Sequence, residues 1–371
     1  MKVAVIGAGV AGTAAAWAAR RSGSEVVVIH DRPGASALGS GAADYESWER
    51  DAGGHELTAD ATLLTAELGY VTEPGLVATA AGLLRPARAH DAAVLDLSAF
   101  AGRRIAVADV VRDDWDAVLI ARALSDTKWA RQTGTSFEAR GLDLDLANQA
   151  SGYDLAHRFD DPDQAGALAA ALKKSRGEAD AWLLGPWLGV QLGTAARVRQ
   201  LAEMPIGETL SPPGGAAGAR FEAARDLALS KAEVGVRRGQ VREVSVAPRG
   251  IEVSLDGDQT LVVDRVVLAI GGVVGGGVEL EQIGRRFHLS LAAPVRLQAK
   301  GKSIDAASTL HGVDFAFHGV SLIENVGIET DHLAVPGVAG VFAAGDAVAD
   351  RPRTWLRALE SGLAAGRAAG R

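Results

Sequence analysis

The sequence contains no cysteine among its 371 residues. The chain therefore has no redox-active disulfide, no thiolate ligands for an iron–sulfur cluster and no cysteine to which a cofactor could be attached. If electrons must leave this chain one at a time, another protein has to accept them.

Long apolar runs and an excess of positive charge are also missing. Outside the alanine-rich N-terminal stretch, the longest uncharged apolar run is 266–278, which is rich in glycine and shorter than the roughly 18 residues that a membrane span needs. A net charge of −8 argues against a nucleic-acid binder, which needs a basic surface. No spacing typical of metal ligands stands out. We expect a cytoplasmic protein with a small-molecule substrate and no metal, which contacts a membrane, if at all, through a partner.

What the sequence does contain is a βαβ unit at its start. Val3–Ile6 is a short apolar strand, Thr13–Arg21 is alanine-rich and helical in propensity, and Glu25–Ile29 is a second apolar strand. Between the first strand and the helix, Gly7, Gly9 and Gly12 form the pattern G-x-G-x-x-G. In this context the three glycines allow a tight turn, close approach of a pyrophosphate and close packing of helix on strand. The pattern predicts a dinucleotide site.

The second strand ends unusually. An acidic residue normally stands there to bind the adenosine ribose, but here His30 holds that place and Asp31 follows it. Either Asp31 reaches the ribose or His30 makes one hydrogen bond to it. The contact departs from the common pattern, which leaves FMN open as an alternative to FAD.

Two later segments favour a flavin over a nicotinamide. Residues 260–272 form an apolar stretch that ends in Ala-Ile-Gly-Gly, and 340–347 form a short strand that ends in Gly345 and Asp346. Both are similar to segments of two-dinucleotide-fold flavoproteins, where such an aspartate binds the ribityl chain. A carboxylate accepts two hydroxyl hydrogen bonds, which suits that role. The small residues of 36–43 are predicted to let backbone N–H groups approach the cofactor. The predicted cofactor-binding residues are Gly7, Ala8, Gly9, Val10, Ala11, Gly12, His30, Asp31, Ser36, Ser40, Gly41, Ala42, Val241, Ala269, Gly271, Gly345, Asp346, Ser361 and Gly362.

The remaining pattern predicts an α/β fold with two parts. A Rossmann-like flavin domain of the two-dinucleotide-binding type takes 1–74, 210–290 and 325–371, and an inserted α/β substrate or cap domain takes 75–209 and 291–324. In the inserted part we expect a strand at 104–110, a helix at 117–124 and a helix body at 163–174 capped by Asp161. From 234 onward, segments 234–238, 241–246 and 251–255 are predicted as three antiparallel strands, followed by a buried strand at 260–270. A last strand at 341–344 and a helix at 355–369 complete the chain.

The order of the motifs resembles the B subunit of anaerobic glycerol-3-phosphate dehydrogenase, a flavoprotein related to the fumarate reductase and succinate dehydrogenase flavoproteins. The generic segments are GAGVAG (7–12) and AAGD (343–346); LRPARAH (84–90), LSPPGG (210–215) and RTWLRALESG (353–362) are more specific. The resemblance implies oxidation of a small phospho-alcohol, noncovalent FAD (or FMN), and electron transfer to a second flavoprotein subunit and an iron–sulfur subunit that serves quinone. Segment 32–47 has no histidine, so the covalent histidyl–flavin link of fumarate reductases is not expected.

A phosphorylated alcohol needs cationic groups for the phosphate and a base for the hydroxyl proton. Arg85, His90 and Arg353 are the predicted catalytic residues. Further candidates are Arg88, His311, His318, Arg351 and Arg357. Two alternatives remain open: a flavin-carrying electron-transfer or structural subunit without its own substrate site, and a stand-alone oxidase or monooxygenase.

Overall fold

A computed structural model describes residues 1–44, 56–144, 150–281, 286–304 and 323–371. The chain divides into two compact units. Unit 1 comprises 1–36, 56–64 and 225–371, and unit 2 comprises 37–55 and 65–224. This division differs from the predicted one because strand pairing ties 37–44 to unit 2 and 291–304 to unit 1. Strand β3 (Ala42–Ala43) pairs with β7 (Ala89–Asp91), and β19 (Leu297–Ala299) pairs with β21 (Gly327–Ile328).

Unit 1 is built on a five-stranded parallel sheet of order β12-β2-β1-β16-β22. Its strands are β1 (Lys2–Ile6), β2 (Glu25–His30), β12 (Gly235–Arg238), β16 (Arg265–Leu268) and β22 (Val341–Ala343). The central strand β1 is buried from Val3 onward, as a strand covered on both faces should be. This sheet confirms the predicted Rossmann-like α/β class.

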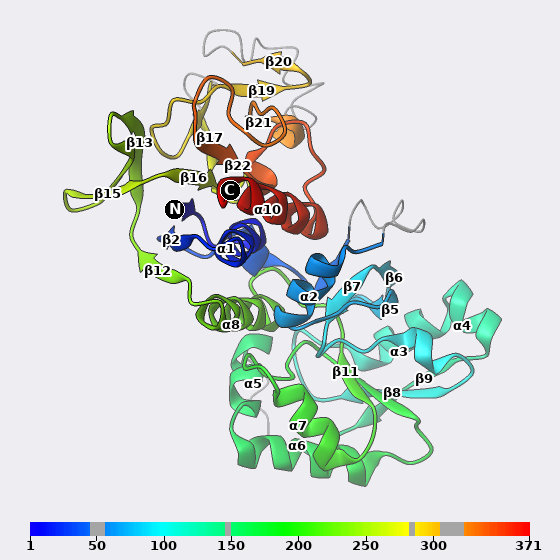
Figure 1. The fold of residues 1–371 in the computed structure, drawn as a ribbon. Helices are drawn as coiled ribbons and strands as arrows, with labels where there is room; N and C mark the ends of the chain where they lie inside the picture. The colour runs from blue at the N-terminus through cyan, green and yellow to red at the C-terminus, as the bar shows by residue number, and fades with distance from the viewer. Residues whose placement is uncertain (45–55, 145–149, 282–285, 305–322) are drawn as a thin grey trace. The chain divides into compact units, whose positions relative to one another are not determined.

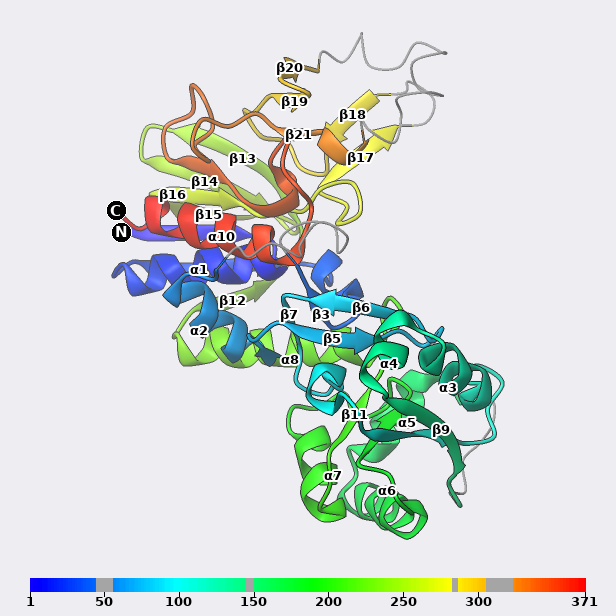
Figure 2. The ribbon, with the colours of Figure 1, turned by 90° about the vertical axis from the view of Figure 1, so that its right-hand side faces the viewer.

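Helices α1 (Val10–Arg21) and α10 (Trp355–Ala369) lie side by side in unit 1 (Figures 1 and 2). Glycines at four-residue spacing on α10 make this close packing possible. A side chain on Gly362 would overlap the carbonyl oxygen of Ala11, and one on Gly366 would overlap that of Ala15. The predicted cofactor residue Gly362 therefore serves the contact between two helices.

The β-rich segment after residue 234 differs from the prediction at two points. Strand β12 joins the parallel sheet beside β2, so the antiparallel sheet consists of β13 (Val241–Ala247), β14 (Gly250–Leu255) and β15 (Gln259–Val263). The single strand predicted for 260–270 is divided between β15 and β16. Asp264 causes the division, since its backbone N–H donates to Lys2 O (2.9 Å) and its carboxylate accepts from Lys2 N (2.6 Å).

The remaining short elements of unit 1 lie outside the five-stranded parallel sheet. They are β17 (Val278–Glu281), β18 (Arg286–Leu289), β19, β20 (Lys302–Ser303), β21 and the 3-10 turn η4 (Gly345–Ala347). Boundaries between the units fall inside the 3-10 turn η1 (Ala35–Leu38), α2 (Ala59–Glu67) and α8 (Ala216–Lys231).

Unit 2 contains a second parallel sheet, of order β11-β10-β8-β9. Its strands are β8 (Arg104–Asp109), β9 (Ser136–Gly141), β10 (Ala181–Leu184) and β11 (Ile206–Glu208). The helices between them are α3 (Ala117–Ser125), α4 (Lys128–Thr133), α5 (Gly152–Phe159), α6 (Pro162–Ser175) and α7 (Thr194–Ala202). In both ribbon views α3 and α4 lie on one side of β8 and β9, and α6 and α7 on the other (Figures 1 and 2). The 3-10 turns are η1 (Ala35–Leu38) and η3 (Leu97–Phe100), and the small antiparallel pairings involve β3, β4 (Tyr70–Val71), β5 (Gly75–Ala78), β6 (Leu84–Ala87) and β7.

In unit 2, the helix cap and the element starts that the local sequence predicts agree with the structure. Asp161 caps α6 by accepting hydrogen bonds from the backbone of Asp163 and Gln164 at 3.0 and 3.1 Å, with Pro162 in the first turn. Strand β8 and helix α3 begin at the predicted residues.

A buried ionic network that the sequence does not reveal holds unit 2 together. The guanidinium of Arg220 donates to Asp91 Oδ2 at 2.8 Å, to Glu208 and to the carbonyl of Gly189. The three charged side chains are almost wholly buried. Burial raises the pKa of Glu208, and Arg220 opposes that rise. Because each charge has a partner, we expect the network to stabilise unit 2 only as long as it is complete.

No helix within the described ranges is both long and apolar enough to cross a membrane. Within the same ranges, no three histidine, aspartate or glutamate side chains are grouped so that they could hold a metal ion.

Candidate functional site

The G-x-G-x-x-G segment forms a tight turn between β1 and α1. Gly7 has φ +105°, and a side chain there would overlap the carbonyl oxygen of Ala269. A side chain on Gly12 would overlap the carbonyl oxygen of Gly7. Gly9 precedes the helix and provides no side-chain cap, so the first turn of α1 directs its N–H groups toward the space in front of it. This geometry is the anion site that a dinucleotide pyrophosphate requires.

Ser36 lies beside this turn. Its hydroxyl oxygen accepts a hydrogen bond from the backbone N–H of Val10 at 2.9 Å. A Cβ atom on Gly9 would lie 3.3 Å from that oxygen, so the approach is close. With its oxygen engaged by Val10, the Ser36 hydroxyl keeps its proton for a phosphate oxygen.

An open cavity of about 840 Å³ extends from the glycine turn, and it lies wholly within unit 1. We call it the dinucleotide cleft. The predicted residues that line it are Gly7, Ala8, Gly9, Val10, Ala11, His30, Asp31, Ser36, Val241, Ala269, Gly271 and Asp346. These residues come from separate segments of the chain, which the parallel sheet brings to one edge.

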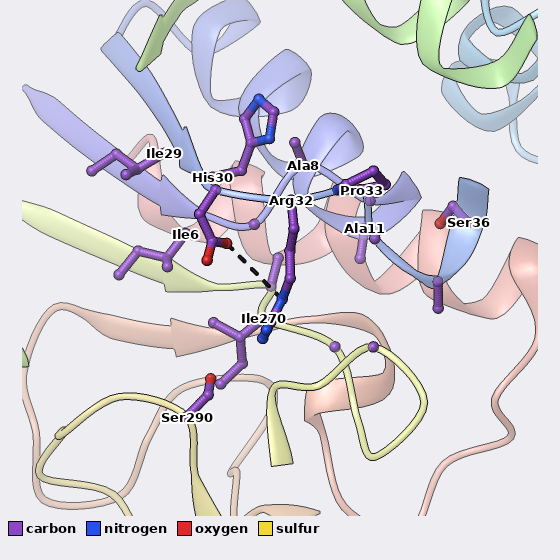
Figure 3. A pocket seen from close by; sticks show the side chains of 18 of the residues that line it. Ile6, Ala8, Ala11, Ile29, His30, Arg32, Pro33, Ser36, Ile270 and Ser290 are labelled. Atoms are coloured by element: carbon purple, nitrogen blue, oxygen red, sulfur yellow. Dashed lines mark ion pairs between the residues drawn. The ribbon is translucent and has the colours of Figure 1, made fainter. Parts of the chain in front are cut away.

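The end of β2 lies at this cleft, and Arg32, which the sequence analysis did not select, spans its mouth. Arg32 donates to the carbonyl of Gly276 at 2.8 Å and lies 4.0 Å from the carboxylate of Asp31, as the dashed line in Figure 3 marks. The ring of His30 points away from Arg32 in the same view. Its Nδ1 atom is buried and has no partner in the described part of the chain. The position of Arg32 directly after His30 and Asp31 was the sequence signal that could have identified it as a cleft residue.

Asp346 also lines the cleft and follows shortly after β22. Burial raises the pKa of its carboxyl group, and the nearby Arg353 guanidinium opposes the rise. Ser361 fixes the backbone beside it, because the Ser361 hydroxyl accepts from Gly345 N–H at 2.8 Å and donates to the Ala358 carbonyl at 2.9 Å. Gly345 and Ser361 thus position Asp346 and do not line the cleft themselves.

The predicted catalytic residues belong to different units of the chain. Arg353 belongs to unit 1, where it donates to the carbonyl of Val326 at 2.5 Å. Arg85 and His90 belong to unit 2, together with Ser40, Gly41 and Ala42. Arg85 is half-buried, forms an ion pair with Asp44, and burial lowers the pKa of its guanidinium.

His90 is 3% exposed, its Nδ1 lies 3.2 Å from the carbonyl of Asp91, and its Nε2 has no partner in the described part of the chain. Arg88 donates to the carbonyl of Thr72 at 2.7 Å. The catalytic roles of these residues remain predictions. His311 and His318 lie outside the described residues.

The sequence matches one family model over residues 5–59, and that model describes an NAD(P)-binding Rossmann-like domain. The match covers the end of β1, the glycine turn, α1 and β2. Together with the cleft, it defines the first part of the chain as a Rossmann-like domain with a noncovalent dinucleotide site.

Comparison with solved structures finds distant likenesses, including the following three. A GidA-related protein from Thermus thermophilus is 10% identical, with 98% of this chain and 95% of that chain covered and a TM-score of 0.34. Iminodiacetate oxidase from Chelativorans sp. BNC1 is 15% identical (99% and 93% covered, TM-score 0.31). The anhydrotetracycline hydroxylase OxyS from Streptomyces rimosus is 11% identical (100% and 62% covered, TM-score 0.37).

At these scores the likenesses define neither an activity nor a substrate. A comparison with curated proteins finds no match. Nothing in the family description or in these three structures is specific to anaerobic glycerol-3-phosphate dehydrogenase.

Proposed function

We propose that the chain is an oxidoreductase that binds FAD noncovalently in the dinucleotide cleft. The observation that carries this proposal is the pairing of the glycine turn with Asp346 in one cavity. The turn suits a pyrophosphate, and the carboxylate suits the hydroxyl groups of a ribityl chain next to it. A nicotinamide cofactor has no ribityl chain, so Asp346 is what favours a flavin.

The described residues fit such a cofactor. The carboxylate of Asp346 has no hydrogen-bond donor within the described part of the chain, although burial disfavours its charge. Hydroxyl donors of a bound ligand would satisfy it. Glycine at position 7 lets the turn pack against the loop after β16, because any side chain there would meet the backbone of Ala269. When bound, FAD supplies the hydride acceptor for substrate oxidation.

The chain's own residues would hold and orient the cofactor. Backbone N–H groups of the first turn of α1 and the Ser36 hydroxyl would bind the pyrophosphate. Asp31 would accept from the adenosine ribose, since its carboxylate lies beside Arg32 at the cleft mouth. His30 is the weaker candidate because its ring points away from Arg32 (Figure 3).

A direct test is anaerobic reduction of the bound flavin. Purified protein reconstituted with FAD is mixed with glycerol 3-phosphate or with members of a panel of small alcohols, amines and aromatic compounds, and absorbance near the flavin maximum is followed. Bleaching by at least one compound supports an oxidoreductase with its own substrate site. Binding of FAD without bleaching by any compound, together with fast electron exchange with a partner, would contradict it.

The sequence resemblance supplies a more specific hypothesis: a dehydrogenase subunit that oxidises glycerol 3-phosphate and passes electrons to an iron–sulfur partner. Its support is the set of motifs and the lack of cysteine, which requires any cluster to lie in another chain. Arg85 is a weaker candidate for binding the substrate phosphate, because its positive charge is already paired with the carboxylate of Asp44. Bleaching by glycerol 3-phosphate without release of peroxide in air would favour this hypothesis, and steady peroxide release would favour a stand-alone oxidase.

A further inference from the structure

The parallel sheet of unit 2 has a point at which the direction of strand order reverses. From β8 the chain proceeds to β9 at one edge, and it then returns to β10 on the other side of β8 and continues to β11. The loops after β8 and β10 therefore leave the sheet in opposite directions. In open parallel sheets, ligands bind in the crevice that such diverging loops form at the carboxyl ends of the strands.

A cavity lies at this point, and every residue that lines it belongs to unit 2. It encloses about 1390 Å³ including its open mouth. The loop after β8 contributes Asp114 and Trp115, and the loop after β10 contributes Pro186 and Trp187. The segment after β11 adds 210–215. We call it the switch-point cavity.

The lining of the switch-point cavity is mainly apolar and includes three aromatic rings. The rings of Trp115 and Trp187 meet edge to face, with centroids 5.7 Å apart and an angle of 86° between their planes. Tyr153, at the start of α5, is 39% exposed and adds a third ring. Trp115 and Trp187 are 6% and 2% exposed, so they form a buried wall of the cavity, and the ring of Tyr153 is the exposed aromatic surface against which another planar ring can pack.

The charges at the switch-point cavity balance one another. Arg85 is paired with Asp44, and Asp114 lies 2.6 Å from the guanidinium of Arg112. The site therefore offers no unbalanced cation, within the described part of the chain, to a doubly charged phosphate. The hydroxyl groups of Ser40 and Tyr153 have no partner among the described residues and are suited to a ligand hydroxyl or carbonyl.

We propose that the switch-point cavity of unit 2 binds an uncharged, planar aromatic molecule that bears a hydroxyl or carbonyl group. The proposal rests on the strand order, the aromatic lining and the balanced charges, and it does not depend on the proposed FAD site. It predicts selection against small phosphorylated alcohols at this place.

The test is isothermal titration calorimetry of the full-length protein with 2-naphthol, with glycerol 3-phosphate as the negative probe. Ala80 is exposed and lines the cavity, whereas the adjacent Ala81 is exposed and does not line it. Ala80→Trp should fill the cavity and weaken 2-naphthol binding by at least about tenfold, the equivalent of one lost aromatic contact. Ala81→Trp is the matched control and should bind as the wild-type chain does.

A second variant tests the site without adding a bulky tryptophan ring, which could disturb the fold. Tyr153→Ala should weaken 2-naphthol binding about fivefold to tenfold, and Tyr153→Phe should weaken it less because the ring remains. The proposal is overturned if 2-naphthol does not bind, if Ala80→Trp and Ala81→Trp bind it equally, or if glycerol 3-phosphate displaces it.

Discussion

Replacement of Asp346 by asparagine separates a cofactor-binding role from a structural one. The amide has nearly the same shape as the carboxylate but carries no charge. A hydrogen bond to a charged group contributes about 1.5–3 kcal/mol, against about 0.5–1.5 kcal/mol for a neutral one. If the carboxylate binds ribityl hydroxyls, the substitution should cost about 1–2 kcal/mol, which is a roughly fivefold to thirtyfold loss of FAD affinity.

The same substitution should have the opposite effect on the protein without flavin. Burial raises the pKa of Asp346 above its ordinary value of 3.8. Between the two pKa values the unfolded chain holds fewer protons than the folded one, so the stability of the flavin-free protein falls as the pH rises through that window. Asparagine removes this penalty. At pH 7 the flavin-free Asp346→Asn variant should unfold at the same temperature as wild type or at a higher one.

Asp350 provides a control of opposite sign. Hydrogen bonds from Gln298 and from the backbone of Lys300 and Gly301 hold the pKa of its carboxyl group below the ordinary value, despite the opposing effect of burial. Asp350→Asn should therefore lower the unfolding temperature and leave FAD affinity unchanged. Calorimetric titration with FAD and thermal unfolding of the flavin-free proteins give both readouts. Wild-type FAD affinity in Asp346→Asn, or a loss of several degrees in its flavin-free form, would refute the reasoning.

Three further predictions concern the glycines and the buried charges. Gly7→Ala combines a strained φ with an overlap against Ala269, so stability should fall by about 2–5 kcal/mol in urea unfolding and FAD binding should be lost; retained binding would contradict the glycine-turn account. Gly362→Ala should destabilise because α1 blocks the added methyl group, whereas Gly166→Ala, with open space in α6, should stabilise by about 0.5–1 kcal/mol. Equal effects of the two would refute the helix-contact argument. Arg220→Met should cost at least about 3 kcal/mol, because it leaves two buried carboxylates without a partner; a neutral result would show that the network is dispensable.

Local sequence patterns predicted the parts of the fold that depend on near neighbours. The βαβ unit, the Asp161 cap and helix α10 all follow from residues within a few turns of one another. The glycine turn is visible for the same reason, since its function depends on the backbone freedom of residues within one short segment.

Features that depend on distant pairing were not predictable in this way. The short strand β12 has the same sequence, GVRR, whether it pairs with β13 or with β2, and only the folded sheet decides. Asp264 divides 260–270 through its bonds to Lys2, which is remote in sequence. Gly362 looks like a cofactor glycine until Ala11 is found against it. The switch-point cavity requires the order of four strands, which no local pattern contains.

The measurement that tests the central claim most directly is identification of the cofactor released from the purified protein by mild denaturation. The account predicts FAD, released without covalent attachment and in about equal amount to the protein after reconstitution. Release of FMN alone would show that the adenosine part of the dinucleotide cleft is not used. Failure to bind any flavin, with binding of NAD or NADP in its place, would contradict the account.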